Sequence, residues 1–346
     1  MLKKKKEGIN AEEKFYIASQ WQLMWRKFKK HKLAIFGGAI LAIFYIVALF
    51  CEFFSPYGIY QRYPKHIYCP PQRIRFFDEQ GFHLCPFVYG FKQTRNLETL
   101  KREYRKDETK KYPIYFFVHG NEYKLLGLFP FDIHFLGVKE GTMFLFGTGV
   151  LGRDLFSRNI YATRISLSIG LVGVAFSFIL GCVLGGVSGY YGGAADMIIQ
   201  RVIEFLLSMP TIPLWMALAA ALPPDWPPIK VYFGITIILS IMGWCGLARV
   251  VRGKLLELRE EDFALAAKIA GASEVRIIVR HLLPSFLSYL VVSLTLAIPY
   301  MILGETTLSF LGIGLRSPVV SWGVLLQNAQ NFRTVALYSW LLFPSL

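Results

Sequence analysis

Carboxylate and hydroxyl side chains that could carry chemistry stand inside a long apolar run near the end of the sequence. Glu305 is followed by Thr306, Thr307 and Ser309. A charge at membrane depth is costly, so it indicates a functional site by default. Glu305 and Ser309 could contact a polar solute on a translocation path. Glu305 could equally be a structural carboxylate that accepts hydrogen bonds from its neighbours, and both interpretations stay open.

A second group of charges lies at the start of another apolar run. It consists of Asp196, Arg201 and Glu204, of which Arg201 and Glu204 are three residues apart. Residues at this spacing are neighbours on a helix surface, which predicts an ion pair. We interpret the group as structural, because each charge lies near an interface where water or a partner is available.

The cysteines allow one disulfide. Cys69 and Cys85 lie in a long polar stretch and could pair if that stretch faces an oxidising compartment. Cys51, Cys182 and Cys245 lie in or beside apolar runs, where cysteine behaves as a small hydrophobe. No Cys/His group has the spacing of zinc ligands, so no metal site is predicted.

Two further kinds of chemistry are absent from the sequence pattern. There is no G-x-x-x-x-G-K-[ST] loop to cradle phosphates, so we predict that this chain neither hydrolyses ATP nor holds a cofactor. The formal charge of +15 does not indicate a nucleic-acid binder. Its densest basic groups, Lys3–Lys6 and Arg26–Lys32, come directly before an apolar run, as cytoplasmic charge beside a membrane span does.

The elements that must position these residues are membrane helices. The chain has 346 residues, of which 54% are hydrophobic and 18% charged, and its mean hydropathy is +0.42. The apolar residues fall into blocks of roughly 18–25, the length that crosses a hydrocarbon core. We predict an all-α polytopic membrane protein with six transmembrane helices. They are Leu33–Phe54, Ile165–Val187, Met197–Leu222, Val231–Val250, Phe286–Leu303 and a last one, truncated, from Val335 to Leu346.

The other segments differ in kind from these spans. Residues 1–32 form an N-terminal segment. The pattern of residues 13–32 predicts a basic amphipathic helix on the membrane surface, and a disordered basic tail is the alternative. Residues 55–160 form a polar insertion with a small β-containing domain. Two hairpins are predicted there, one turning at Asp78–Gly81 and one at His119–Glu122. Residues 161–346 form the helical core.

The distribution of basic residues predicts the orientation. With the N-terminus in the cytoplasm, the insertion lies outside and the loop Arg249–Pro284 lies inside. That loop carries Arg249, Arg252, Lys254, Arg259, Lys268, Arg276 and Arg280. In the second span, Gly181, Gly185 and Gly189 recur at four-residue steps, which predicts a close contact between two helices.

The loop Arg249–Pro284 is too long for a simple connection between spans. A short helix is predicted from Asp262, with Gly271 at its end, and a second from Glu274 to Leu283, which stops at Pro284. Two short helices on the inner membrane face could dock another protein, with small residues at the contact. An ordinary interfacial loop would show the same pattern.

The small residues of this loop carry a family resemblance. The run Ala266-Ala267-x3-Gly271 followed by Leu283-Pro284 resembles the EAA loop of the permeases of ABC importers. Leu265 stands where glutamate is usual in this pattern, and His281 where isoleucine is usual. The C-type permeases of the oligopeptide/dipeptide branch show the same two departures. That branch, with its MetI-like fold, is also similar to this chain at Phe146–Arg158, Ile165–Gly170, Asp262–Gly271, Arg280–Pro284, Glu305–Gly312 and Ser321–Gly323.

Two features depart from the branch. Gly149 stands where an aspartate is usual, which puts a role of that carboxylate in doubt, and the insertion at about 60–145 is larger than in most members. The resemblance implies that the loop is a coupling helix in a groove of a cytoplasmic ATPase. The implied coupling residues are Asp262, Ala266, Ala267, Gly271, Ala272, Ser273, Leu283 and Pro284.

The resemblance also implies the partners and the task. They are a second permease subunit in a heterodimer, two ATPase subunits that bind ATP and Mg²⁺, and an extracytoplasmic binding protein, all at a prokaryotic cell membrane. The implied substrates are di- and oligopeptides, with oligosaccharides or nickel as alternatives. A secondary transporter driven by an ion gradient is the alternative of another class. It would show inverted repeats and ionisable residues at the midplane, and neither is evident.

Overall fold

The computed structural model describes residues 25, 28–78, 81–95 and 102–345. The chain divides into two compact units, residues 1–47 and 48–346. The first holds most of α3 (Lys32–Leu49), an apolar helix of 18 residues in which Ala48 is the buried residue. A short helix α4 (Cys51–Phe54) follows, so the predicted first span is present with a break at Phe50. The amphipathic helix predicted for 13–32 lies mostly outside the described residues.

Four described helices are long and apolar enough to cross a membrane: α3, α5 (Leu155–Tyr191), α8 (Pro228–Leu258) and α12 (Leu287–Phe310). The predicted span Met197–Leu222 is instead two helices, α6 (Gly193–Ser208) and α7 (Thr211–Ala220), at 90° to each other. The bend lies at Met209, which precedes Pro210. A residue before proline avoids the helical region, and Met209 takes φ −91° and ψ 138°. The pair counts at most as one broken span.

The predicted sixth span is not found among the described residues, so the six-helix count is not confirmed. Residues after Val335 form the end of α14 (Phe332–Leu337) and a 3-10 helix η3 (Ser339–Ser345), both too short to cross a bilayer. Contacts with the insertion hold this segment: Tyr338 stacks on Tyr68 at 4.1 Å, and Trp340 Nε1 donates to Thr148 O at 3.2 Å.

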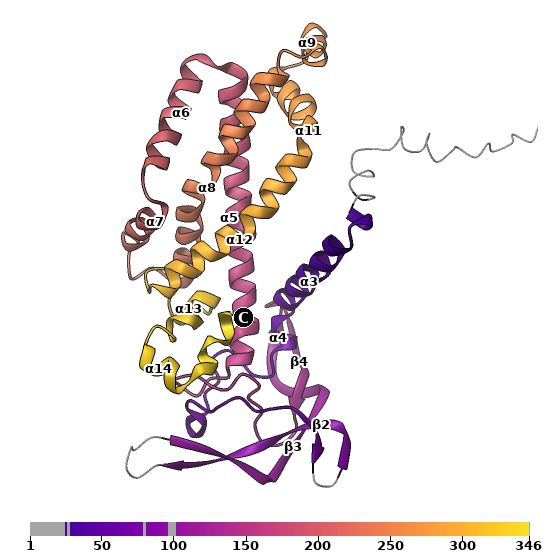
Figure 1. The fold of residues 1–346 in the computed structure, drawn as a ribbon, viewed down its shortest axis with the longest axis vertical. Coiled ribbons are helices and arrows are strands. Elements are labelled where there is room, and N and C mark those ends of the chain that lie inside the picture. Colours follow the sequence, from indigo (N-terminus) through magenta and orange to yellow (C-terminus); the bar gives the residue numbers. More distant parts are fainter. Residues whose placement is uncertain (1–24, 26–27, 79–80, 96–101, 346) are drawn as a thin grey trace, which may run out of the picture. The chain divides into compact units, whose positions relative to one another are not determined.

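The centre of the second unit is the contact between α5 and α8 (Figure 1). A Cβ atom added at Gly185 would lie 2.6 Å from Ala248 O, and one at Gly189 would lie 2.7 Å from Arg252 O. Only glycine allows the two backbones to come this close, so the helix contact predicted from Gly181, Gly185 and Gly189 is confirmed. The main apolar core adds side chains from α7 and α12 to this pair.

The insertion contains one antiparallel sheet in the order β1-β2-β3-β4. Its strands are β1 (Arg75–Asp78), β2 (Gly81–Arg95), β3 (Arg102–Leu125) and β4 (Phe129–Val138). The first predicted hairpin is confirmed, since Asp78 pairs with Gly81. The second turns at residues 126–128 and not at His119–Glu122, where β3 continues through a shift in register.

The predicted disulfide is absent, because Cys69 and Cys85 are both free. Cys69 is fully buried, and its backbone N–H donates to Thr148 Oγ1 at 2.8 Å. Cys85 lies on β2 with its side chain exposed. The two thiols thus have opposite environments, one in the interior and one on the surface of the sheet. Cys51 and Cys245 are fully buried, as expected of small hydrophobes.

Candidate functional site

The predicted docking loop forms a compact helical unit at the end of the bundle opposite to the sheet (Figure 1). Its first helix, α9 (Asp262–Ile269), has an acidic residue in its first turn and Lys268 in its last, which suits the helix dipole. Gly271 ends it with φ +79°. The N–H of Gly271 donates to Lys268 O at 3.0 Å, and that of Ala272 donates to Ala267 O at 3.1 Å. Two carbonyl oxygens of the last turn are thereby satisfied.

One face of α9 is held by the bundle. Ala264 is buried in an apolar cluster with residues of α8 and of the following helical run, and Ala267 and Ala272 pack against the same cluster. Alanine at these positions lets the α9 backbone lie close to its support. The helix is therefore positioned by packing on one side only.

The other face of α9 is not covered by any residue that the structure describes. Leu265 is 45% exposed and Ile269 is 88% exposed, and four residues separate them, so they share one face. Ala266 is exposed beside them, and a Cβ atom at Gly271 would meet nothing within 4 Å. The predicted small residues Ala266 and Gly271 thus lie on the surface, whereas Ala267 and Ala272 pack against the apolar cluster that holds α9.

The second predicted helix extends past Pro284. It consists of α10 (Glu274–Arg276), a π-helical stretch η2 (Ile277–Leu282) and α11 (Leu283–Ser285), and it ends at Phe286. The prediction that Pro284 stops it was wrong. Proline lies in the first turn of α11, where a helix does not need its N–H. Ser273 precedes α10, and its carbonyl accepts from Ile277 N at 2.9 Å.

Two polar contacts fix this end of the bundle. Arg252 on α8 forms a bidentate pair with Asp196 on α6, at 2.5 and 2.6 Å, and Ser188 Oγ donates to the same carboxylate at 2.5 Å. Three helices meet at this point. Arg259 donates to the carbonyl oxygens of Gly189 and Tyr190 at 3.4 and 3.3 Å, where a cation suits the C-terminal end of α5.

The Asp196–Arg252 pair was missed in the sequence, because 56 residues separate its partners. The predicted pair of Arg201 with Glu204 is confirmed at 2.7 Å, and both side chains are largely exposed. An exposed pair of this kind contributes little to stability. The charges of α6 are therefore structural ones, and Asp196 is the one that ties helices together.

Glu305 and Ser309 lie fully buried in a hydroxyl network toward the other end of the bundle. Glu305 Oε1 accepts from Ser309 Oγ and Ser321 Oγ, both at 2.7 Å, and Glu305 Oε2 lies 3.4 Å from Ser166 Oγ. This is the arrangement of a satisfied structural carboxylate. A direct contact of Glu305 with a solute stays a prediction.

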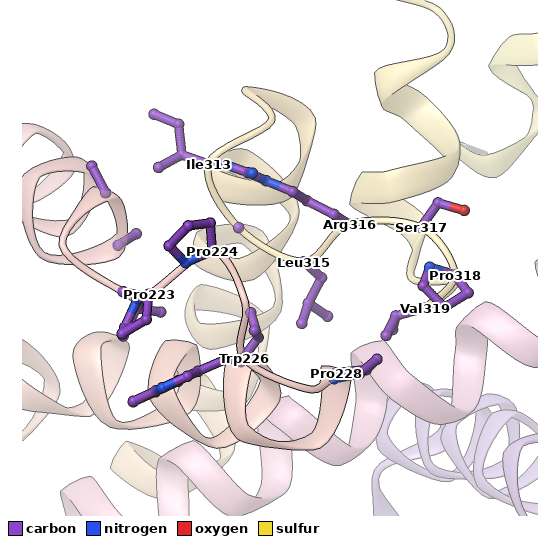
Figure 2. Close-up of a pocket in the computed structure, with 15 residues that line it drawn as sticks. Pro223, Pro224, Trp226, Pro228, Ile313, Leu315, Arg316, Ser317, Pro318 and Val319 are labelled. Atoms are coloured by element: carbon purple, nitrogen blue, oxygen red, sulfur yellow. The ribbon is translucent and has the colours of Figure 1, made fainter.

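The same network supports a cavity of about 360 Å³ between the α7–α8 connection and the segment after α12 (Figure 2). Trp226 and Pro224 line it from one side, and Arg316 and Pro318 from the other. Ser309 Oγ accepts from the N–H of Leu315 at 3.0 Å, which fixes the lining segment to α12. The hydroxyl network thus shapes a surface that a solute could reach.

A buried acid at the start of α5 was not singled out from the sequence. Asp154 caps the helix, and its Oδ2 accepts from Ser157 N at 2.7 Å, while its Oδ1 has no hydrogen-bond partner among the described residues. Burial raises the pKa of Asp154 to about 6, although the hydrogen bond with Ser157 lowers it in part. Gly149 is buried nearby, and a Cβ atom there would find room, 3.9 Å from Leu155 Cδ2.

Comparisons with known proteins identify two matching families. The family described as "Binding-protein-dependent transport system inner membrane component" matches residues 177–345. The family described as "N-terminal TM domain of oligopeptide transport permease C" matches residues 19–71. Together they cover both ends of the chain and leave out most of the insertion.

Curated relatives agree with these families. The dipeptide transport system permease protein DppC of Bacillus subtilis is 38% identical over 202 residues, which is 58% of this chain and 61% of the relative. The oligopeptide transport system permease protein OppC of the same organism is 34% identical over 198 residues, 57% of this chain and 62% of the relative. These two matches span less than two thirds of the relatives' length.

A third relative matches almost throughout. The dipeptide transport system permease protein DppC of Lactococcus lactis subsp. cremoris is 30% identical over 328 residues, which cover 93% of this chain and 83% of the relative. The chain therefore belongs to the inner-membrane permeases of binding-protein-dependent transport systems, in the oligopeptide and dipeptide permease branch.

Proposed function

We propose that this chain is a permease subunit of an ABC importer that moves di- and oligopeptides across a prokaryotic cell membrane. Its relatives carry the names of dipeptide and oligopeptide transport permeases. The ATPase subunits, with their ATP and Mg²⁺, a second permease subunit and an extracytoplasmic binding protein complete the importer. The chain itself forms part of the path and performs no hydrolysis.

The observation that carries this proposal is the one-sided support of α9. Ala264 anchors the helix in the bundle, while Leu265 and Ile269 present an apolar face that none of the described residues covers. An apolar face on a charged cytoplasmic loop fits the groove of a partner protein. Movement of an ATPase at α9 would reach α8 directly, because both belong to one apolar cluster.

The orientation follows from the same assignment. If α9 meets a cytoplasmic ATPase, the N-terminus is also cytoplasmic and the sheet lies outside. The cavity lined by Trp226 and Arg316 lies beside the α7–α8 connection, at the end of the bundle away from α9 (Figure 1). We propose it as the part of this subunit that first meets the solute.

The test replaces Ile269 by aspartate in the assembled importer, in proteoliposomes with binding protein and labelled peptide. We expect peptide uptake and peptide-stimulated ATP hydrolysis to fall at least tenfold, because a charge would be buried at the docking surface. Gly271→Arg should also abolish transport, but φ +79° at Gly271 adds backbone strain to the steric effect. Ile269→Asp is therefore the cleaner change.

The matched control is Leu84→Asp, since Leu84 on β2 is 87% exposed and far from α9 in the sequence. It should leave uptake unchanged. Normal uptake by Ile269→Asp would refute the docking assignment. Uptake without ATP would favour the ion-driven alternative, and competition by an oligosaccharide or nickel, but not by peptides, would overturn the substrate.

A further inference from the structure

The β3–β4 hairpin ends in an apolar tip that the permease function does not explain. Residues 125–131 read Leu-Leu-Gly-Leu-Phe-Pro-Phe, and we call this segment the hairpin tip. Lys124 and Asp132 stand directly before and after it. Hairpin turns in water favour asparagine, aspartate and glycine, so an uncharged run of this length is unusual there.

The side chains of the hairpin tip are exposed in this chain. Leu128 is 73% exposed and Phe129 is 63% exposed, and Leu126 and Phe131 are also on the surface. Leu126 has φ +53°, a region that leucine rarely adopts. A large apolar residue at a strained turn position, where asparagine would fit better, indicates that its hydrophobicity is used by a partner.

The partner is indicated by where the hairpin lies. It packs against α4, the end of the first span: Phe53 contacts Phe117 and Phe135 at ring distances of 6.1 and 5.9 Å, and Phe54 contacts Phe135 at 5.4 Å. A continuous aromatic layer thus connects the span to the hairpin. In Figure 1, β4 rises beside α4.

The direction of the hairpin follows from two contacts with the same segment. His134 Nδ1 lies 2.5 Å from the carbonyl oxygen of Ser55, just after α4. Tyr123, which lies closer to the hairpin tip, has its pKa raised by burial and by the carboxylate of Glu52, inside α4. Going toward the tip therefore means going toward the start of α4, the helix beside which β4 rises in Figure 1.

We propose that the hairpin tip inserts into the interface of the lipid bilayer beside the first span and anchors the sheet to the membrane. Aromatic residues favour the level of the lipid headgroups, and Leu128 would reach the acyl boundary. Lys124 at the base suits lipid phosphates. The leaflet is the outer one, given the orientation proposed above.

A protein partner fits these observations less well. The hairpin tip itself carries no charged side chain that would specify a protein surface, and it lies next to a segment that already enters lipid. A bilayer needs no complementary shape, so the strained apolar turn is sufficient for it. The second permease subunit or the binding protein would each cross-link as a protein adduct, which the test distinguishes from a lipid adduct.

The test places the photo-reactive residue p-benzoylphenylalanine at position 128 or 129 of the full chain. The chain is assembled with the second permease subunit, the ATPase subunits and the binding protein in phosphatidylethanolamine and phosphatidylglycerol liposomes. After irradiation, mass spectrometry of the chain should show phospholipid adducts at both positions. Position 84 on β2 is the matched control, because Leu84 is also highly exposed. We expect at least ten times more lipid adduct at 128 and 129 than at 84.

Lipid adducts at 128 and 129 no more frequent than at 84 would overturn the proposal, and so would adducts mainly to another protein subunit. A second measurement uses Leu128→Asp with Phe129→Asp. Neither side chain belongs to a buried cluster, so the hairpin should keep its fold, while the adduct at an added photo-reactive residue 126 should fall at least fivefold. These readouts do not depend on peptide uptake or on α9.

Discussion

Gly185 offers the most direct test of the helix pair at the centre of the bundle. We predict that Gly185→Ala destabilises the protein and that Gly186→Ala, one residue further on, does not. A Cβ atom at Gly185 would lie 2.6 Å from Ala248 O and 2.8 Å from Val251 Cβ. At Gly186 the nearest atom would be Ile278 Cγ2 at 3.7 Å, which is an ordinary contact.

The magnitude follows from the size of this clash. The new methyl group at position 185 is about 0.8 Å too close to a backbone oxygen, since ordinary contact begins at 3.4 Å. Backbone atoms cannot rotate away, so α5 and α8 must separate, and overpacking of this kind costs about 1–3 kcal/mol. Both variants gain the same helix propensity, about 1 kcal/mol for alanine over glycine. The difference between them is therefore the packing cost alone.

The assay is thermal unfolding of the two purified variants at one scan rate in the same detergent, because membrane proteins often unfold irreversibly. Gly185→Ala should unfold at least about 3 °C below Gly186→Ala, from the usual relation between free energy and Tm. Gly181→Ala is a graded control. Its Cβ would meet Leu247 Cδ2 at 2.9 Å, which can rotate away, and Leu247 Cβ at 3.0 Å, which is less close than the backbone oxygen at Gly185, so its Tm should lie between the other two.

Equal Tm values for the Gly185 and Gly186 variants would refute this reasoning. They would mean that α5 and α8 are not as close in the membrane protein as they are in the structure. A loss of stability at Gly186 alone would place the contact on the wrong face of α5. A fall in both variants would point to a glycine requirement within α5 itself, unrelated to α8.

Three further predictions concern other buried or exposed groups. Glu305→Leu should lower the free energy of unfolding by about 2–4 kcal/mol, because it leaves Ser309 and Ser321 without their acceptor. Glu305→Gln keeps an acceptor oxygen and should cost less, and thermal unfolding of both variants measures the difference. Asp154 has a folded pKa of about 6, above its unfolded value, so the folded state holds an extra proton between about pH 4 and 6. Stability should therefore fall as the pH rises through that window, by an amount on the order of 3 kcal/mol, and denaturation of Asp154→Asn should not show this slope. Cys85 should react with a membrane-impermeant maleimide added outside without a reductant, and Cys69 only after unfolding, whereas a disulfide between them would block both reactions.

The short helix α9 could be predicted from the sequence because its signals are local. Gly271 at the end of α9 and acidic residues at its start act within one or two turns, and the structure places both as expected. The π-helical stretch before Pro284 was not predictable, because proline normally ends a helix. Which alanines face the bundle and which face outward also depends on α8, which lies elsewhere in the sequence.

The errors in the fold come from apolar runs whose neighbours are distant in the sequence. Hydropathy carries no information about a bend, so Met197–Leu222 was predicted as one continuous span although it contains Pro210. The last run is short and is held by Tyr68, 270 positions before Tyr338. In the sheet, Gly120–Asn121 has the residue types of a turn and was predicted as one. The actual turn is at Leu126–Gly127, where the apolar residues do not indicate a turn.

The position of α5 explains how the two ends of this subunit can act together. Near one end of the helix, Ser166 Oγ lies at the Glu305 network and accepts from Trp322 N at 3.2 Å. Near the other, Gly189 contacts the α8 backbone beside Arg252. The glycines let the α5 and α8 backbones pack in direct contact, and a close-packed pair of helices transmits a displacement from one helix to the other. A displacement of α9 that moves α8 must then move α5 as well, and with it the segment that lines the cavity beside Arg316. This coupling needs a rigid α5–α8 pair, which is a physical reason for glycine at each of the three positions.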